Sequence, residues 1–205
     1  MRLHCEFSSP VARTDLDDYV RHLEISVGCS DEDGSAEYTV GKLAMDQVLW
    51  ADAIVDGVSL FEVCDGDSQG LHDVHVALTK GGQEFRADLR INEVTDHVLF
   101  LYGAVFHPAV HPYRQGILQA ALSLFGEASL DVMWKDTSGL SETELADVGF
   151  CKIAGSDLIF RHSALRTPFG DRFPRGRDAD VVARPDHEEW VEREWQRFGG
   201  PPGEA

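Results

Sequence analysis

An almost continuous apolar run, VLFLYGAVF (98–106), constrains the fold of this chain more than any other segment. A strand that is apolar on both faces is typical of an inner strand covered by other elements on both sides. A loop with two prolines, an amphipathic helix over 114–128 and a short apolar strand over 130–134 follow it. Because a strand, a helix and a strand form the usual crossover between parallel neighbours, the sequence predicts a parallel pair inside a mixed sheet.

The segments around this unit predict an α/β fold with a mixed, mostly antiparallel sheet and flanking helices. Alternating apolar positions and turn residues favour strands, whereas apolar residues spaced by three or four and Ser caps favour helices. Ser141 and Glu144 form the spacing of a capping box, which marks a helix start. The expected strands lie at 3–7, 22–29, 38–57 and 84–94, and a final strand or hairpin is expected at 151–165. Helices are expected from 59 to Gly66, at 68–79 with Ser68 as the cap, and after Ser141, and Ile117 and Leu118 belong to the buried stripe of the helix over 114–128.

The charge of the chain restricts its partners. Its 205 residues hold 36 Asp and Glu against 18 Lys and Arg, a formal net charge of −18. Such a surface repels nucleic acid and anionic lipid and attracts cations, so we expect no nucleic-acid or membrane partner and favour a small amine. The segment at 1–15 lacks a long apolar stretch, and no apolar run is long enough to span a bilayer. We therefore expect a cytoplasmic protein.

Cysteine and histidine spacing argues against a metal site. None of Cys5, Cys29, Cys64 and Cys151 forms a C-x-x-C pair, which disfavours a zinc knuckle or a redox dithiol. His107 and His111 are four residues apart, but Pro108 and Pro112 deny them the helix that this ligand spacing needs. Either imidazole is instead a candidate proton acceptor.

The last part of the chain reads as an extension of one domain. Residues 1–166 make up the expected domain, and 167–205 form a Gly-, Pro-, Arg- and Asp-rich extension. Within it, an amphipathic helix is expected at 186–198, with Val191, Trp195 and Phe198 on one stripe. This helix is expected to dock on the domain or on a second subunit, which would make a homodimer.

The order of these elements resembles the GNAT superfamily of N-acetyltransferases over residues 20–165. The apolar strand, the loop HPAVHPY and the helix RQGILQAAL are similar to the family's segment in which a strand, a loop and an Arg lead into a helix. LADVGFCKIAGSDLIF is similar to its later helix, Gly-Phe turn and last strand. The resemblance implies a GNAT-like fold in which two parallel strands splay apart.

The resemblance also implies acetyl-CoA, or another acyl-CoA, as co-substrate. The family's pyrophosphate loop reads Q/R-x-x-G-x-G/A and presents backbone N–H groups at a helix start. Arg114 matches its first position, whereas Ile117 and Gln119 stand at the two small positions; starting at Gln115 instead would bring Ala120 into the last one. The residues implied for binding the acyl-CoA are Ala104, Val105, Arg114, Gln115, Gly116 and Ile117.

Two functions follow from this resemblance. In the first, the protein is an acyl-CoA-dependent N-acyltransferase acting on a small amine or amino group, with His107 or Tyr102 handling the proton. In the second, it is a GNAT-fold protein that has lost transfer chemistry and binds or regulates. The second function is favoured by Leu145, which stands where many family members carry a Tyr that protonates the departing thiolate, and by the absence of a carboxylate from 98–106.

Overall fold

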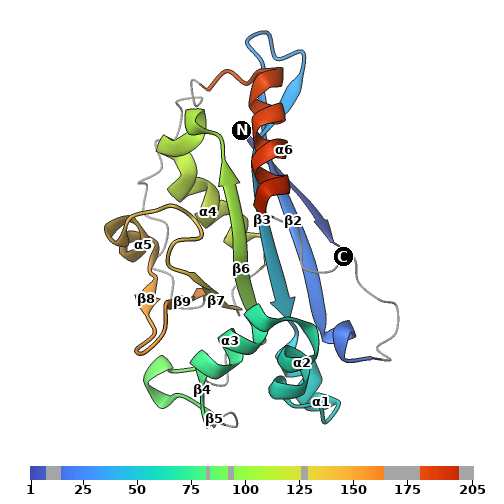
Figure 1. Ribbon diagram of the computed structural model, residues 1–205, viewed down its shortest axis with the longest axis vertical. Helices are drawn as coiled ribbons and strands as arrows, with labels where there is room; N and C mark the ends of the chain where they lie inside the picture. The colour runs from blue at the N-terminus through green and yellow to red at the C-terminus, as the bar shows by residue number, and fades with distance from the viewer. Residues whose placement is uncertain (8–14, 82–83, 92–94, 126–128, 164–180, 199–205) are drawn as a thin grey trace.

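The computed structural model describes residues 1–7, 15–81, 84–91, 95–125, 129–163 and 181–198. Seven strands form one sheet in the order β1-β2-β3-β6-β7-β9-β8 (Figure 1). Among these described strands, β6 and β7 pair in parallel and every other neighbour is antiparallel. Their bounds are β1 (Arg2–Phe7), β2 (Val20–Ser30), β3 (Glu37–Val48), β6 (His97–Phe106), β7 (Ser129–Trp134), β8 (Cys151–Lys152) and β9 (Leu158–His162).

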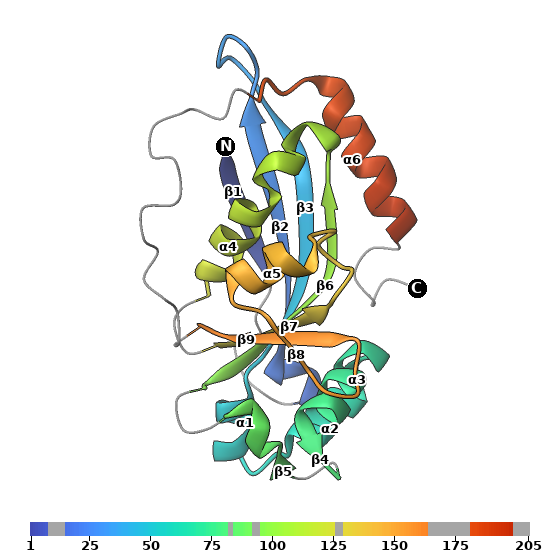
Figure 2. The same ribbon diagram turned by 90° about the vertical axis from the view of Figure 1, so that its left-hand side faces the viewer.

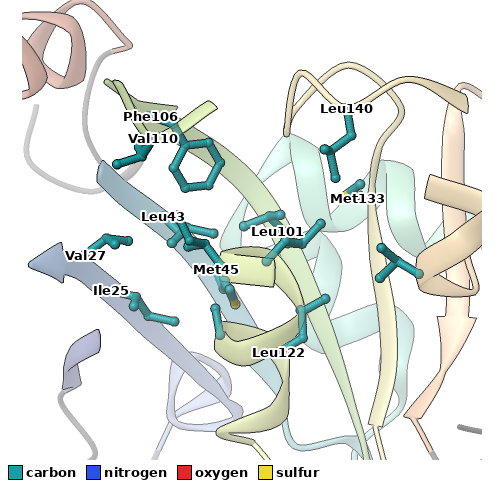
Figure 3. Packing of buried hydrophobic residues seen from close by; sticks show 14 of the residues in the cluster. Ile25, Val27, Leu43, Met45, Leu101, Phe106, Val110, Leu122, Met133 and Leu140 are labelled. Carbon is teal, nitrogen blue, oxygen red and sulfur yellow. The ribbon is translucent and has the colours of Figure 1, made fainter. Parts of the chain in front are cut away.

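Helices α4 (Arg114–Ser123) and α5 (Glu142–Val148) cover one face of the sheet. Their apolar side chains meet inward-facing residues of the central strands, such as Leu43, Leu101 and Met133 (Figure 3). Burial of this apolar surface is the main favourable contribution to folding on this side. The crossover from β6 through α4 to β7 is therefore confirmed, and it places the start of α4 beside the end of β6.

Four of the described helices lie on the opposite face. The helices α1 (Trp50–Val55), α2 (Leu60–Asp67) and α3 (Gln69–Leu78) build a second core with the lower half of the sheet. Helix α6 (Pro185–Phe198) lies across the upper half, on the side away from α4 (Figure 2). Successive strand residues point to opposite faces, so Lys42 faces α6 while its neighbour Leu43 faces α4. The helix expected at 186–198 is thus confirmed, docked on its own domain.

Several sequence predictions hold at the level of single residues. Ser68 caps α3 by accepting a hydrogen bond from the Leu71 N–H, and Ser141 and Glu144 form the expected capping box of α5. Ile117 and Leu118 lie on the buried stripe of α4. The expected α/β class with a mostly antiparallel mixed sheet is confirmed.

Three expected boundaries are wrong. The strand predicted over 38–57 leaves the sheet at Leu49, because Trp50 and Ala53 have helical spacing and pack as the start of α1. The helix predicted over 114–128 ends at Ser123, where Leu124 turns and stays exposed.

Of the strand predicted over 84–94, residues 92–94 lie outside the described residues, and the described part contains only β5 (Glu84–Phe85), which pairs with β4 (Thr79–Lys80) outside the main sheet. The chain then forms the 3-10 turn η2 (Ala87–Leu89), and Arg90 takes a left-handed conformation with φ of 51°. The Arg86 guanidinium holds this turn, since it donates to Asp88 and to the Ala154 carbonyl.

The remaining short elements are the 3-10 turns η1 (Leu16–Tyr19) and η3 (Pro108–Tyr113). The loop expected at 107–113 is therefore a 3-10 turn that runs directly into α4. Within the described part of the chain, no helix combines the length and the apolarity that crossing a bilayer requires. Residues 164–166 of the expected domain and residues 167–180 and 199–205 of the expected extension lie outside the described residues.

Candidate functional site

The pairing between strands β6 and β7 ends halfway along β6. Their parallel pairing runs from His97 with Ser129 to Leu101 with Met133. Beyond this point β6 continues to Phe106 and pairs with β3 alone, while β7 ends at Trp134. One edge of residues 102–106 therefore has no strand beside it among the described residues.

A cavity of about 500 Å³ lies at this unpaired edge. Ligand sites commonly have this size. Four parts of the chain border it and leave it open to solvent: the end of β6, the junction of η3 and α4, the turn after β7, and helix α6. Its lining residues are Ala104, Val105, Phe106, His111, Arg114, Asp136, Thr137, Ser138, Gly139, Trp190, Glu194, Arg197 and Phe198. We call this cavity the cleft.

Arg114 brings a positive charge to the cleft from the first position of α4. Its guanidinium lies 3.6 Å from the Glu144 carboxylate, and its buried Nε has no hydrogen-bond partner among the described residues. A buried donor without a partner is costly, and an anionic ligand in the cleft would satisfy it. Glu144 is held by its Ser141 cap, whose backbone and hydroxyl hydrogen bonds lower its pKa, so it remains charged beside Arg114.

The start of α4 is less open than the sequence predicts. Tyr113 at the N-cap makes no side-chain capping bond, but the Arg114 N–H already donates to the His111 carbonyl, because η3 leads straight into the helix. Of the residues implied for acyl-CoA binding, Ala104, Val105 and Arg114 line the cleft. Gln115, Gly116 and Ile117 do not, and the Ile117 side chain is buried in the core under α4.

The two loop histidines occupy different settings. The ring of His107 stacks on His187 of α6, with centroids 4.0 Å apart, and meets the edge of Trp190. Its Nδ1 accepts a hydrogen bond from the Ala109 N–H, so the neutral ring carries its proton on Nε2. Burial and the neighbouring His187 keep the pKa of His107 below its usual range. His107 therefore lies under α6, not on the cleft wall.

His111 does line the cleft. Its Nε2 lies 3.1 Å from the Phe106 carbonyl oxygen. A carbonyl can only accept, so Nε2 carries the proton and Nδ1 of the neutral ring is the basic nitrogen. Of the two imidazoles weighed as proton acceptors, the structure places His111 at the cavity.

Tyr102 does not line the cleft. It lies at the irregularity where the register of β6 shifts against β3, and its ring stacks on Phe198 with centroids 6.5 Å apart. A buried carboxylate one strand away, Asp46, is also outside the cleft; burial raises its pKa, although His22 Nδ1 lies 2.8 Å from it. The carboxylates that do line the cleft are Asp136 and Glu194.

Sequence reasoning missed two walls of the cleft. The turn at 136–139 follows a predicted buried strand, and its Asp-Thr-Ser-Gly composition is a turn signal that could have marked it. Glu194 and Arg197 have no local signal, because only the docking of α6 brings them to β6. Within the described residues, no group of three or more His, Cys, Asp or Glu side chains is arranged to bind a metal.

Comparisons with protein-family models, with curated proteins and with solved structures found no match to this chain. The assignment of a function therefore depends on the chemistry of the cleft.

Proposed function

We propose that this protein is an acyl-CoA-dependent N-acyltransferase of GNAT type, with acetyl-CoA as its donor and a small amine as acceptor. The observation that carries this proposal is that the pairing of β6 with β7 ends at Leu101 and that a cavity lies at the unpaired edge of β6 beyond it. A strand edge without a neighbour keeps backbone N–H and C=O groups available to a ligand that lies alongside it. An extended thioester arm is such a ligand, and backbone N–H groups near Ala104 and Val105 would polarise its carbonyl.

Arg114 supports an acyl donor that carries negative charge. Its partnerless Nε and its position at the first turn of α4 combine a guanidinium with the positive end of a helix. These features suit the pyrophosphate of a CoA-type molecule, which carries its negative charge at one end of an extended chain.

His111 is the residue we assign to the proton. When the acceptor nitrogen attacks the thioester carbonyl, a C–N bond forms, the C–S bond breaks and the nitrogen must lose a proton. Nδ1 of His111 can take this proton while Nε2–H stays bonded to the Phe106 carbonyl, which fixes the ring. The proton then passes to the departing sulfur, so charge and atoms balance.

The test is a binding titration. Acetyl-CoA and free CoA should bind the native protein and raise its melting temperature, because a ligand of the folded state stabilises it. Arg114→Met should weaken the binding of both by at least about tenfold, since a charge-assisted contact is lost. Arg90→Met removes a positive charge at an exposed position that does not line the cleft, so it serves as the control. If neither CoA nor acetyl-CoA binds, the proposal fails.

One observation favours binding without transfer as a second function. Leu145 of α5 stands where the family carries its general-acid Tyr, and its side chain is buried in the core. This position therefore offers no proton to a departing thiolate. The two functions differ in one measurement, the release of free thiol from acetyl-CoA in the presence of amines. Transfer requires thiol release that depends on the amine and falls in His111→Gln but not in His107→Gln. Binding of acetyl-CoA without any thiol release would leave the second function.

A further inference from the structure

Helix α6 presents two separate stripes. Val191 and Trp195, four residues apart, are buried against the sheet. Trp190, Glu194 and Arg197 follow at steps of four and three along the next stripe, and they line the cleft together with Phe198, which lies beside Trp195. The helix that docks the tail on the domain therefore also forms one wall of the cleft.

Several contacts fix the position of this wall on the sheet. Glu192 forms an ion pair of 2.8 Å with Lys42, whose ammonium also lies over the Trp195 ring. Before the helix, the Ala183 N–H donates to the Ser30 carbonyl at the end of β2. At its other end, the Phe198 ring lies so close to Gly103 that a Cβ there would come within 2.4 Å of it. A wall held at both ends and in the middle is preorganised to recognise a ligand.

Opposite charges stand side by side on this wall. The Glu194 carboxylate accepts from Arg197 Nη1 at 2.7 Å, and Arg193 lies 3.7 Å from the same oxygen. Across the cleft, Asp136 and Arg114 repeat one negative and one positive charge. A ligand group that touches the Glu194–Arg197 pair and carries only one kind of charge would meet repulsion as well as attraction there, whereas a zwitterionic group matches both.

The rest of the wall is apolar and aromatic. Trp190 and Phe198 lie on either side of the charged pair along the helix, and Ala104 and Val105 at the edge of β6 line the same cavity. Phe198 stacks on Tyr102 and Trp195 but keeps 44% of its surface exposed, so part of its ring remains accessible to a ligand. Aromatic and small apolar walls favour a ligand with an apolar, planar side chain.

We infer that the cleft binds a free α-amino acid with an aromatic side chain. Its ammonium group pairs with Glu194, its carboxylate pairs with Arg197, and its side chain lies between Trp190 and Phe198. This inference rests on the proposed function only for the reaction of the bound amino acid. In that reaction the amino group is the acyl acceptor, and the ammonium group loses a proton before the nitrogen attacks the thioester. The binding of the amino acid needs no acyl donor.

The experiment is calorimetric titration of the full chain without CoA, with four probes. L-Phenylalanine carries both charges, 2-phenylethylamine lacks the carboxylate, 3-phenylpropanoate lacks the ammonium, and glycine lacks the ring. L-Phenylalanine should bind about tenfold more tightly than each of the other three, because each lacks one charged or apolar contact. Equal affinities for all four, or no binding of any, would overturn the inference.

Two variants assign the contacts. Arg197→Met should abolish the preference for L-phenylalanine over 2-phenylethylamine, and Glu194→Gln should abolish its preference over 3-phenylpropanoate. Both residues lie off the docking stripe, so the variants should keep the melting temperature of the parent. Glu189→Gln, an exposed position on the same helix, is the matched control and should leave both preferences intact.

The two proposals fail separately. Binding of L-phenylalanine without any binding of CoA would overturn the proposed transferase and leave the amino-acid site. Binding of acetyl-CoA with equal response to all four probes would overturn the amino-acid site and leave the transferase. If both preferences persist in Arg197→Met and Glu194→Gln, the assignment to α6 is wrong.

Discussion

The imidazole rings of His107 and His187 lie face to face, with centroids 4.0 Å apart and 17° between their planes. His107 begins η3 next to the cleft, and His187 belongs to the first turns of α6. The stack therefore joins the loop that leads into α4 to the helix that forms the cleft wall. Two rings in this arrangement repel each other if both are protonated.

This stack makes the docking of α6 sensitive to acid. The pKa of His107 is lowered in the folded protein by burial, then by His187 and His111, against the attraction of Asp186. A depressed histidine pKa means that the unfolded chain binds protons more readily, so stability is full above about pH 6.5 and falls as the pH drops below it. His187→Phe keeps a ring in the stack and removes its charge. Its free energy of unfolding should fall less between pH 8 and pH 5 than that of the parent.

Urea denaturation at both pH values measures this difference, and hydrogen exchange over 185–198 shows whether α6 is the part that opens. His97, which is also buried with a lowered pKa, contributes acid sensitivity to both proteins and cancels in the comparison. An identical fall in the parent and in His187→Phe would show that the stack carries no pH dependence.

The Phe198 ring can pack against β6 only because residue 103 is a glycine. A Cβ at this position would come within 2.4 Å of the ring, so Gly103→Ala should displace the end of α6. We expect a loss of about 1–3 kcal/mol in the free energy of unfolding, typical of overpacking. In a Phe198→Ala background the same substitution should cost almost nothing. A double-mutant cycle by urea denaturation tests this, and an equal cost in both backgrounds would contradict it.

Arg161 and Asp131 form a buried ion pair between β9 and β7. Arg161 Nε donates to the Asp131 carboxylate at 2.6 Å, and both side chains are almost fully buried. Arg161→Leu should destabilise the protein by about 3–5 kcal/mol, because it leaves a buried carboxylate without a counter-charge. Asp131→Asn combined with Arg161→Leu should recover part of this loss, since the Ser129 hydroxyl can still donate to the amide oxygen. Thermal and urea unfolding of the three proteins decide the order.

Substitutions at Gly116 distinguish the stability of α4 from its contribution to CoA binding. It is the third residue of the helix, where a negative charge interacts favourably with the helix dipole by about 0.3–1 kcal/mol. Gly116 does not line the cleft but lies two residues after Arg114, so Gly116→Asp should stabilise the fold and weaken CoA binding through its charge alone, by repelling the pyrophosphate. Gly116→Ala raises helix propensity without charge and should leave the affinity for CoA unchanged. Unchanged affinity in Gly116→Asp would mean that the start of α4 does not face phosphate.

The elements of the fold were predictable where a local pattern specifies them. The apolar run at 98–106, the stripe of Ile117 and Leu118 on α4 and the caps at Ser68 and Ser141 are each local, and each appears in the structure as expected. The segment at 84–94 failed because its polar alternation resembles a strand. The contact of Arg86 with the distant Ala154 carbonyl holds it as a turn instead.

The cleft depended on contacts between distant segments. Arg114 could be singled out from its place at a helix start, but the partnerless Nε and the distance to Glu144 required the docking of α5 on α4. The same holds for the choice between His107 and His111, which are alike in sequence and differ only in what α6 covers.

Local side-chain periodicity, capping and turn chemistry were enough to define a mixed sheet with a parallel crossover and an amphipathic tail helix, because these signals act over a few residues. Where β6 leaves β7, which imidazole reaches the cavity, and that Glu194 and Arg197 border it were decided by packing between segments far apart in the chain. Such packing depends on the shape of whole faces of the sheet, and no short stretch of residues carries that information.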